Sequence, residues 1–314
     1  MTENTSSHTF QAFWWGDGLS PYEVLCLKSF IDHGHRVNLY TFDSRLAVPD
    51  GVLTCDAAEL ISRDRFFTYK SGQGQGSPAG FSNLFRYRLL AEKGGWWIDT
   101  DVVCLSSRIP IVDQFFAYQE DDLVNGAVLF FQPQHPAILC CYARTEQLGS
   151  SAQWGDTGPR LLTKVLKELA CFDRAYSAEL CYPVHYLDAL DLLRPSEAAA
   201  VAERIKSSLF LHLWNEQLRR NGIQKECLPP RGSVLRQLAD RHGVSGWISE
   251  YDAKTLEYLD LKAELAACYA EIERQKARLD SVLSSTSWRL TAPMRSVARL
   301  FRAWRGQVNP KRRT

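Results

Sequence analysis

The segment 81–101 constrains the fold of this chain more than any other stretch. After Ser82, a favoured N-cap residue, apolar residues recur at helical spacing and predict an amphipathic helix. The glycine pair 94–95 predicts the end of that helix, and the apolar run 96–98 predicts a strand. Polar residues that follow the run therefore lie at the carboxyl end of a strand, which is where open α/β sheets bind ligands.

Two aspartates, Asp99 and Asp101, follow the predicted strand one residue apart. Carboxylate oxygens are hard ligands that suit Mg²⁺ or Mn²⁺, and such an ion can bridge a diphosphate. The alternative is an edge turn with two solvated carboxylates, and the fixed helix and strand upstream argue against it. We therefore predict that both aspartates bind a divalent metal.

The same segment resembles the Asp-x-Asp sugar transferases of glycosyltransferase family 32 and the related capsular-polysaccharide synthesis proteins. The matching positions are Ser82, Asn83, Arg86, Tyr87, Leu90, Gly94, Gly95, Trp97, Asp99 and Asp101. The resemblance is close over this segment and looser over the first two thirds of the chain. It implies an α/β fold of the GT-A type, in which helices flank a Rossmann-like, mostly parallel sheet.

The resemblance also implies a nucleotide-sugar donor, a UDP-sugar above all, and a divalent metal that is usually Mn²⁺. By similarity Asp101 is a direct metal ligand, Asp99 contacts the ribose and the sugar with help from the metal, and Arg86 hydrogen-bonds the donor. These three are the predicted catalytic residues, and Trp97 belongs to the same donor site. Asn83 stands where the family usually has Asp, so a contact with a sugar hydroxyl is retained and an acid/base role is lost.

The first forty residues predict a strand–helix–strand unit. Strands are expected over 9–15 and 36–42, with a helix over 22–32 that starts after a Ser-Pro pair. Alternation of this kind favours a parallel sheet. The first strand ends in Trp14 and Trp15, where the resemblance implies an aromatic ring that stacks on the donor base. The alternative is that these tryptophans are core residues.

Two later positions complete the predicted site. Asn125 precedes Gly126 and resembles the family position at which a polar side chain meets a sugar, although an ordinary Asn-Gly turn is the alternative. An apolar strand over 208–212 ends in His212-Leu-Trp214. The resemblance implies that His212 helps to bind the metal or diphosphate and that Trp214 lies against the departing phosphate. Imidazole suits this chemistry, and a hydrogen-bonded core histidine is the alternative.

Composition describes an ordinary enzyme-sized chain. Its 314 residues are 45% hydrophobic and 23% charged, enough for one large α/β domain with appendages, and the net charge of +1 predicts no nucleic-acid partner. Nine cysteines without a C-x-x-C pair indicate neither a zinc site nor a disulfide framework, and they favour a reducing compartment. No signal-peptide pattern or spanning apolar run is visible, so we expect a cytoplasmic protein.

The carboxyl-terminal part differs in character from the rest. Apolar residues keep heptad spacing through 250–285, which predicts a short coiled coil that either forms a homodimer or packs on its own domain. Residues 286–314 hold eight Arg/Lys and no Asp/Glu. The string at 285–295 resembles the tails of bacterial polysaccharide glycosyltransferases, and the basic amphipathic pattern behind it suits an anionic membrane surface. The predicted catalytic domain is then 1–249.

These features predict a metal-dependent glycosyltransferase. It would move a sugar from a nucleotide-sugar donor to a hydroxyl of a glycan or glycolipid acceptor, with retention of configuration by resemblance. We expect it to act in bacterial cell-surface polysaccharide synthesis, as a peripheral protein at the inner face of the membrane. The alternative is a non-catalytic scaffold that binds a glycan or nucleotide sugar at the membrane, and only Asn83 favours it.

Overall fold

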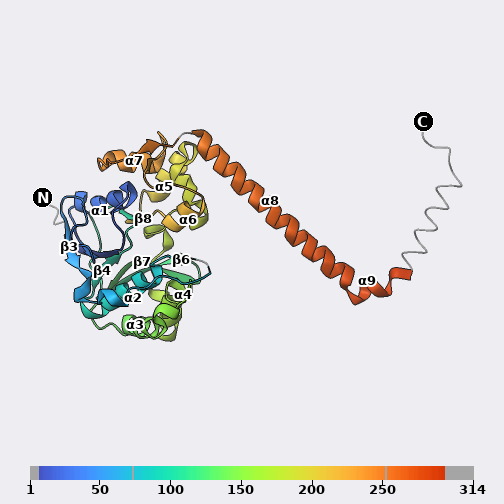
Figure 1. The fold of residues 1–314 in the computed structure, drawn as a ribbon, viewed down its shortest axis with the longest axis horizontal. Helices are drawn as coiled ribbons and strands as arrows, with labels where there is room; N and C mark the ends of the chain where they lie inside the picture. The colour runs from blue at the N-terminus through green and yellow to red at the C-terminus, as the bar shows by residue number, and fades with distance from the viewer. Residues whose placement is uncertain (1–6, 73, 252, 294–314) are drawn as a thin grey trace. The chain divides into compact units, whose positions relative to one another are not determined.

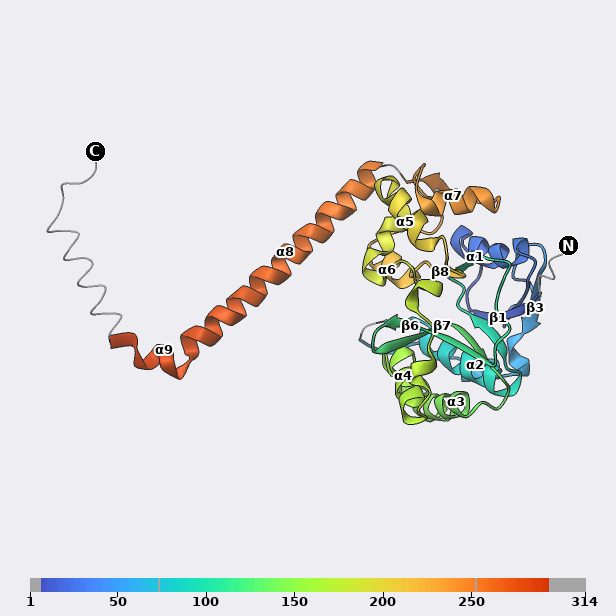
Figure 2. The same ribbon diagram turned by 180° about the vertical axis from the view of Figure 1, so that it is seen from behind.

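The computed structural model describes residues 7–72, 74–251 and 253–293 (Figures 1 and 2). The chain divides into two compact units, 1–252 and 253–314. The first unit contains the sheets and the candidate site, and the second begins with a long helix. Most of the basic tail predicted for 286–314 lies outside the described residues.

A six-stranded sheet with the strand order β3-β2-β1-β4-β7-β6 forms the centre of the first unit. Its strands are β1 (Thr9–Trp14), β2 (Arg36–Thr41), β3 (Val52–Asp56), β4 (Gly95–Ile98), β6 (Gln114–Glu120) and β7 (Leu123–Phe131). The first four in spatial order run parallel, whereas β7 is antiparallel to both β4 and β6. A mixed α/β architecture with a mostly parallel central sheet fits a GT-A-like fold.

The predicted strand–helix–strand start is confirmed by β1, α1 (Pro21–Asp32) and β2. Ser20 caps α1 in a capping box. The Ser20 hydroxyl accepts a hydrogen bond from the Tyr22 N–H, and the Glu23 carboxylate accepts one from the Ser20 N–H. Gly34 follows the helix with φ of +84°, a left-handed conformation that glycine adopts without strain. The chain can therefore reverse sharply into β2.

Helices cover both faces of the sheet (Figures 1 and 2). Helices on one face are α2 (Ala79–Glu92), α3 (Pro136–Leu148) and α4 (Pro159–Glu168). On the other face lie α1, α5 (Ala198–Ile205), α6 (Asn215–Arg220) and α7 (Val234–Arg241). Short 3₁₀ helices link these elements, namely η1 (Ala57–Glu59), η2 (Arg63–Arg65), η3 (Gly149–Ser151), η4 (Phe172–Arg174), η5 (Ala178–Leu180), η6 (Tyr186–Leu193) and η7 (Pro195–Glu197).

Two further small sheets lie outside the central one. The pairs are β5 (Val102–Cys104) with β8 (Phe210–His212), antiparallel, and β9 (Cys227–Leu228) with β10 (Ser249–Glu250), parallel. The β5–β8 pair matters for the site, because it brings the segment after Asp101 against a strand from the last third of the first unit. The predicted strand over 208–212 is thus confirmed as β8.

Helix α2 begins earlier than the sequence predicts. Ser82 lies inside its first turn rather than at the N-cap, which is Pro78. The hydroxyl of Ser77 accepts a hydrogen bond from the Ala79 N–H. A free N–H of the first turn is therefore satisfied by a residue that lies before Ser82 in the sequence. The predicted end is confirmed, since Gly94 follows the helix with φ of +63°.

The second unit contains α8 (Ala253–Ser284) and α9 (Thr286–Leu290). Large apolar side chains of α8 are exposed along its length. The coiled coil remains a prediction, and the membrane-binding pattern, which relies on 294–314, lies outside the described residues. Within the described ranges, no helix combines the length and apolar content needed to cross a bilayer.

Candidate active site

The carboxyl ends of three parallel strands meet at one edge of the central sheet. Strand β1 pairs in parallel with both β2 and β4, so the segments after all three strands emerge side by side. Trp15 follows β1, Asp43 follows β2 and Asp99 follows β4. This is the edge at which the sequence predicted the donor site.

Arg86, Trp97 and Asp99 form one compact group, which we call the arginine cluster. An Nη2–H of Arg86 donates to Asp99 Oδ1 at 2.6 Å, and Trp97 Nε1–H donates to the same oxygen at 2.8 Å. The Arg86 guanidinium carbon lies 5.2 Å from the Trp97 ring centroid, within cation–π range. The side chain of Asp99 is 28% exposed and that of Arg86 only 5%. A buried guanidinium therefore fixes the more exposed carboxylate of the motif, since the side chain of Asp101 is 16% exposed.

Gly126 makes room for this arrangement. A Cβ atom at position 126 would overlap Nη1 of Arg86. The backbone of β7 thus approaches the guanidinium more closely than any other residue type would allow. Arg86 Nε is buried without a hydrogen-bond partner within the described part of the chain, so the guanidinium keeps an unused donor.

Asn125 and Gly126 do not form a turn, because both lie within β7 and the hairpin reverses at residues 121–122. The turn interpretation is therefore wrong. The Asn125 amide donates to Gln119 Oε1 at 2.6 Å and accepts from the Ala127 N–H at 2.7 Å. Ala127 in turn accepts a backbone hydrogen bond from Asp99 at 2.8 Å. Asn125 is buried and supports the strand behind Asp99, and a direct contact with a sugar is not what this geometry offers.

Asp101 and His212 form a second group together with Asn215. His212 Nε2 lies 3.1 Å from Asp101 Oδ1, and the Asn215 backbone N–H donates to Asp101 Oδ2 at 3.0 Å. The β5–β8 register, which places Val102 opposite His212, produces this contact. The sequence prediction that His212 joins the Asp-x-Asp motif therefore agrees with the geometry.

The environment of Asp101 keeps its carboxylate ionised. Burial acts to raise the pKa of Asp101, but the charge and hydrogen bond of His212, together with the Asn215 N–H, outweigh burial and lower it below the ordinary value. His212 Nδ1 is buried with no hydrogen-bond partner inside the described ranges. His212 is therefore not a core histidine with both ring nitrogens hydrogen-bonded within the described residues, which was the alternative prediction.

Trp214 holds His212 from one side. Its ring centroid is 4.0 Å from that of His212, and its Nε1–H donates to the Val184 carbonyl at 2.8 Å. The backbone of Trp214 has φ of +57°, an uncommon left-handed conformation for such a bulky residue. This turn aims the next N–H, that of Asn215, at Asp101. Trp214 is buried, so it acts on the site mainly through its two neighbours.

Glu23 lies behind this group, although the sequence analysis did not select it. Its carboxylate is 1% exposed and accepts from Asn215 Nδ2 at 2.9 Å, from the Ser20 N–H and from Lys225 Nζ. Lys225 Nζ is also 5.8 Å from the Trp14 ring centroid. We call Asp101, His212, Asn215, Glu23 and Lys225 the histidine cluster. The capping box at Ser20 was the one signal in the sequence that could have pointed to Glu23.

The Asp101–His212 pair fits a divalent metal. The 3.1 Å between His212 Nε2 and Asp101 Oδ1 is a hydrogen-bond distance in this structure. Two cis ligands about 2.1 Å from a divalent ion also lie about 3 Å apart, so an ion could take the place of the shared proton. No group of three or more His, Cys, Asp or Glu side chains that could hold a metal occurs among the described residues. Magnesium-type sites often use one or two protein carboxylates and complete their shell with substrate phosphates and water. Asp99, held by Arg86 and Trp97, is not part of the pair.

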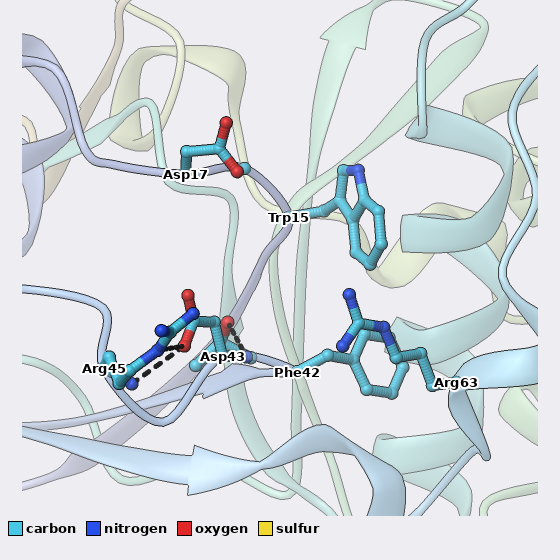
Figure 3. Close-up of a pocket in the computed structure, with 8 residues that line it drawn as sticks. Trp15, Asp17, Phe42, Asp43, Arg45 and Arg63 are labelled. Atoms are coloured by element: carbon cyan, nitrogen blue, oxygen red, sulfur yellow. Dashed lines mark hydrogen bonds and ion pairs between the residues drawn. The ribbon is translucent and has the colours of Figure 1, made fainter.

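A cavity of about 230 Å³ opens at the carboxyl ends of β1 and β2 (Figure 3). It is lined by Trp15, Gly16, Asp17, Thr41, Phe42, Asp43, Arg45 and Arg63. Phe66 stacks on Trp15 with 3.7 Å between ring centroids, and the Arg63 guanidinium carbon lies 5.6 Å from the centroid of the same ring. A base could stack on Trp15 only where Phe66 and Arg63 leave its ring open. Trp15 was predicted from the sequence, whereas Asp43 and Arg63 were not, although Asp43 lies two residues after the parallel strand β2.

Two residues predicted to contact the donor are buried in this structure. Trp97 is 1% exposed and its N–H donates to Asp99, so it positions that carboxylate. Asn83 is also buried, and its amide donates to Thr157 Oγ1 at 3.1 Å. Tyr87, one turn further along α2, donates to the Thr157 carbonyl. In this structure Asn83 therefore ties α2 to the segment before α4.

Comparison with known sequences gives a consistent class. A sequence model of the family described as "Alpha 1,4-glycosyltransferase conserved region" matches residues 130–244. The chain is 27% identical over 148 residues to alpha-1,4-N-acetylglucosaminyltransferase of Homo sapiens (43% of this chain, 42% of that protein). It is 22% identical over 147 residues to lactosylceramide 4-alpha-galactosyltransferase of Mus musculus (43% and 41%). The matched part therefore spans about two fifths of the length of these relatives.

Solved structures give weaker similarities. The PaToxG glycosyltransferase aligns with a TM-score of 0.39 at 11% identity, over 77% of this chain and 87% of its own. The apo form of the glycosyltransferase GlyE of Streptococcus pneumoniae TIGR4 aligns with a TM-score of 0.37 at 14% identity, over 82% and 64%. Scores below 0.5 are too low to establish a shared fold.

The family match and the curated relatives support a glycosyltransferase, an enzyme of the class that uses nucleotide sugars. Within that class the similarity is to alpha-1,4-glycosyltransferases, and it does not lead specifically to family 32 or to the capsular-polysaccharide proteins. The matched region contains His212 and Asn215 but starts after Asp101.

Proposed function

We propose that this chain transfers a hexose-type sugar from a nucleotide sugar to a hydroxyl of a glycan or glycolipid. The contact between Asp101 and His212 is the observation that carries the proposal. It joins the Asp-x-Asp motif, which the sequence resemblance singled out, to the region 130–244, which matches the glycosyltransferase family independently. Two segments of the sequence that each resemble glycosyltransferases therefore meet at one pair of side chains.

The donor has a matching path along the sheet edge. The cavity beside Trp15 offers an aromatic face and flanking Asp43 and Arg63 groups for a nucleoside. The Asp101–His212 pair is the proposed holder of Mn²⁺ or Mg²⁺, which when bound would neutralise charge on the leaving diphosphate. The nucleoside would then lie at the carboxyl ends of β1 and β2, and the diphosphate and sugar would lie beyond the carboxyl end of β4, which pairs with β1.

The arginine cluster supplies the proposed sugar end of the site. Asp99 can accept a hydrogen bond from a hydroxyl of the donor sugar, because the hydrogen bonds from Arg86 and Trp97 already hold its carboxylate in place. A preorganised carboxylate beside a buried guanidinium orients a polar substrate without paying reorganisation at the moment of reaction. Arg86 keeps a buried Nε–H without a partner within the described ranges, which suits a charged or hydroxylated ligand nearby.

The acceptor and the stereochemistry are proposed by similarity. The relatives are named for alpha-1,4 transfer, and one of them for transfer to the glycolipid lactosylceramide. Transfer with retention to a glycan or glycolipid would fit those names. The tail resemblance supports bacterial cell-surface polysaccharide synthesis at the inner face of the membrane, and this part of the proposal is independent of the active-site geometry.

A donor screen with the full chain tests the activity. UDP-, GDP- and dTDP-sugars would each be added with Mn²⁺, and both the melting temperature and the release of nucleoside diphosphate measured. We expect one donor, a UDP-sugar, to raise the melting temperature and to be hydrolysed slowly even without acceptor. Excess chelator should stop hydrolysis.

The same screen separates the scaffold alternative. Donor-dependent stabilisation without any diphosphate release, with or without candidate glycan acceptors, would identify a binding protein and contradict the enzyme. Hydrolysis that continues unchanged in excess chelator would contradict the metal. Asp122→Asn is a suitable control for all variants of the site, because this exposed carboxylate lies at the hairpin turn, away from both clusters.

A further inference from the structure

Helix α8 presents a continuous apolar stripe that nothing within the described part of the second unit covers. The stripe follows alternating steps of three and four residues along the helix, and it consists of Tyr258, Leu261, Leu265, Cys268, Ile272, Gln275, Leu279 and Val282. Its large apolar side chains are between 48% and 65% exposed. A stripe of this spacing is the seam of a two-stranded coiled coil.

A single helix of this kind is poorly stabilised by itself. Helices in proteins owe most of their stability to packing of an amphipathic face, and long exposed rows of leucine and isoleucine are unfavourable in water. The stripe spans about three and a half heptads, a length at which pairing of two such helices is expected. We propose that α8 forms a parallel, in-register homodimer with α8 of a second copy of this chain.

Charge along the edges of the stripe selects the parallel orientation. The residues immediately before the stripe positions 258, 265 and 272 are all glutamates, namely Glu257, Glu264 and Glu271. In an antiparallel pair these edges face each other, so Glu271 would meet Glu271 of the second copy, and Arg278, which precedes position 279, would give only Glu264 a basic partner. In a parallel pair Glu271 faces Lys276 of the second copy, five residues further on, and the same offset from Glu257 reaches a lysine in the sequence.

Gln275 supports the same register. It is the one amide in the stripe, and in a parallel in-register dimer it meets Gln275 of the second copy, where two amides can hydrogen-bond. In an antiparallel or shifted pair it would face an apolar residue and lose hydrogen-bond partners. Its present bond to Glu271, one turn away on the exposed surface, is readily exchanged.

The oligomeric state of the full chain tests the proposal. Sedimentation at micromolar concentration should give twice the chain mass of 35.7 kDa. Ile272→Glu places a charge in the seam and should raise the dissociation constant by about a hundredfold or more. Ala277→Glu is the matched control on the outer side of the helix and should leave the dimer intact. A monomer at all accessible concentrations, with α8 still helical by circular dichroism, would overturn the proposal.

Charge reversal tests the orientation. Glu271→Lys and Lys276→Glu should each weaken the dimer by about tenfold, and the double variant should recover most of the loss, because both inter-chain pairs are restored with opposite sign. An antiparallel dimer predicts no recovery. Failure of the double variant to recover would therefore overturn the parallel arrangement even if the protein is dimeric.

Disulfide trapping gives an independent measure of register. In a Cys268→Ser background, Val282→Cys should form an inter-chain disulfide with its own copy under mild oxidation, whereas Ala277→Cys should not. Cross-linking of Val282→Cys only with a second protein carrying Tyr258→Cys, the position opposite 282 when the stripes align antiparallel, would show antiparallel pairing and contradict the proposal. None of these readouts depends on catalysis, so they stand or fall separately from the proposed function.

Discussion

The two clusters that adjoin Thr100 are assembled in opposite ways. The arginine cluster joins residues of one short segment, since Arg86 and Asp99 are only 13 positions apart. The histidine cluster joins residues 111 positions apart in the Asp101–His212 contact and 192 apart in the Glu23–Asn215 contact. Neighbouring aspartates are thus held by a local motif in one case and by the tertiary fold in the other.

This difference indicates which substitutions should disturb the position of each aspartate. Asp99 depends on the close packing of α2 against β4 and β7, which a local change can disturb. Asp101 depends on the turn at Trp214 and on the buried carboxylate of Glu23, so changes far from the motif should reach it. Local changes should therefore harm activity with little effect on stability in the first cluster, and both properties together in the second.

The largest effect is expected from Asp101→Asn. The amide is almost isosteric and can still accept from the Asn215 N–H, but it removes the charge that makes Asp101 a metal ligand. We expect the rate of donor consumption to fall by about 10³-fold, with the fold retained. Initial rates and melting temperature measure the two effects, with Asp122→Asn as control. Activity above about a third of the unmodified level would contradict the role of Asp101.

Gly126→Ala should have the next largest effect. The added methyl group would overlap Nη1 of Arg86 and push the guanidinium away from Asp99. We expect about a 10²-fold loss of activity, because a misplaced group at a reacting centre costs rate steeply. The control is Gly18→Ala, where a Cβ atom meets nothing within 4 Å.

The two outcomes for Gly126→Ala are easily distinguished. Loss of activity with an unchanged melting temperature would support a positioning role for Gly126. Unchanged activity, or a rate loss matched by Gly18→Ala, would show that Arg86 can move without consequence. A large fall in melting temperature would mean that the methyl group disturbs the packing of the strand instead.

The contrast between the clusters also explains what the sequence could predict. The order of helix, glycine pair, strand and Asp-x-Asp is local, so the strand β4 and the positions of Arg86 and Asp99 followed from it. Even there, the burial of Trp97 could not be predicted, because the alternation of sides along a strand does not say whether an aromatic ring faces the core or a ligand. The start of α2 was missed because Ser77 and Pro78 resemble loop residues as much as a cap.

The histidine cluster was less predictable from the sequence than the arginine cluster. His212 was found only by resemblance, and its contact with Asp101 depends on the β5–β8 pairing, which no local pattern specifies. Glu23 was visible only as the third residue of a capping box, and Lys225 carried no signal at all. Asn125 was selected by resemblance, with an Asn-Gly turn as the alternative, and the structure places both residues within β7, where a Cβ atom at position 126 would overlap Arg86.

Glu23→Ala should affect stability more than any other change in the histidine cluster. It removes the acceptor of Asn215 Nδ2 and the partner of Lys225, and it breaks the capping box of α1. Lys225 is partly exposed, so its charge is screened, and we expect a loss of about 2 kcal/mol in the free energy of unfolding. Urea denaturation measures it. Lys28→Ala, which breaks a surface pair on the same helix, should cost about 0.5 kcal/mol or less.

Activity of the Glu23→Ala protein sharpens the comparison. Because Glu23 acts through Asn215, the rate should fall by about tenfold at a temperature where the variant is folded, less than for Asp101→Asn. Addition of metal should recover part of the loss if Asp101 has become a weaker ligand. An unchanged rate and metal requirement would restrict Glu23 to capping α1.

The smallest effect on stability is expected at the contact between the end of α1, the helix that carries Glu23, and the end of α7. His242 Nδ1 bonds Asp32 Oδ2 at 2.8 Å, while its Nε2 is buried without a partner within the described chain. Burial lowers the pKa of His242 below its ordinary value of 6.5, helped by His33 and Arg241 and opposed by Asp32. The unfolded chain therefore binds a proton more readily, so the stability contributed by neutral His242 is present above pH 6.5 and is lost as the pH falls toward the lowered pKa.

This gives a prediction with a defined sign. The free energy of unfolding should decrease between about pH 7.5 and pH 5.5, and His242→Gln should remove up to about 1 kcal/mol of that decrease because glutamine does not titrate. If His242→Gln steepened the acid loss instead, the His242–Asp32 bond would be stabilising the protonated ring, and the contact between α1 and α7 would be an ion pair rather than a buried neutral one.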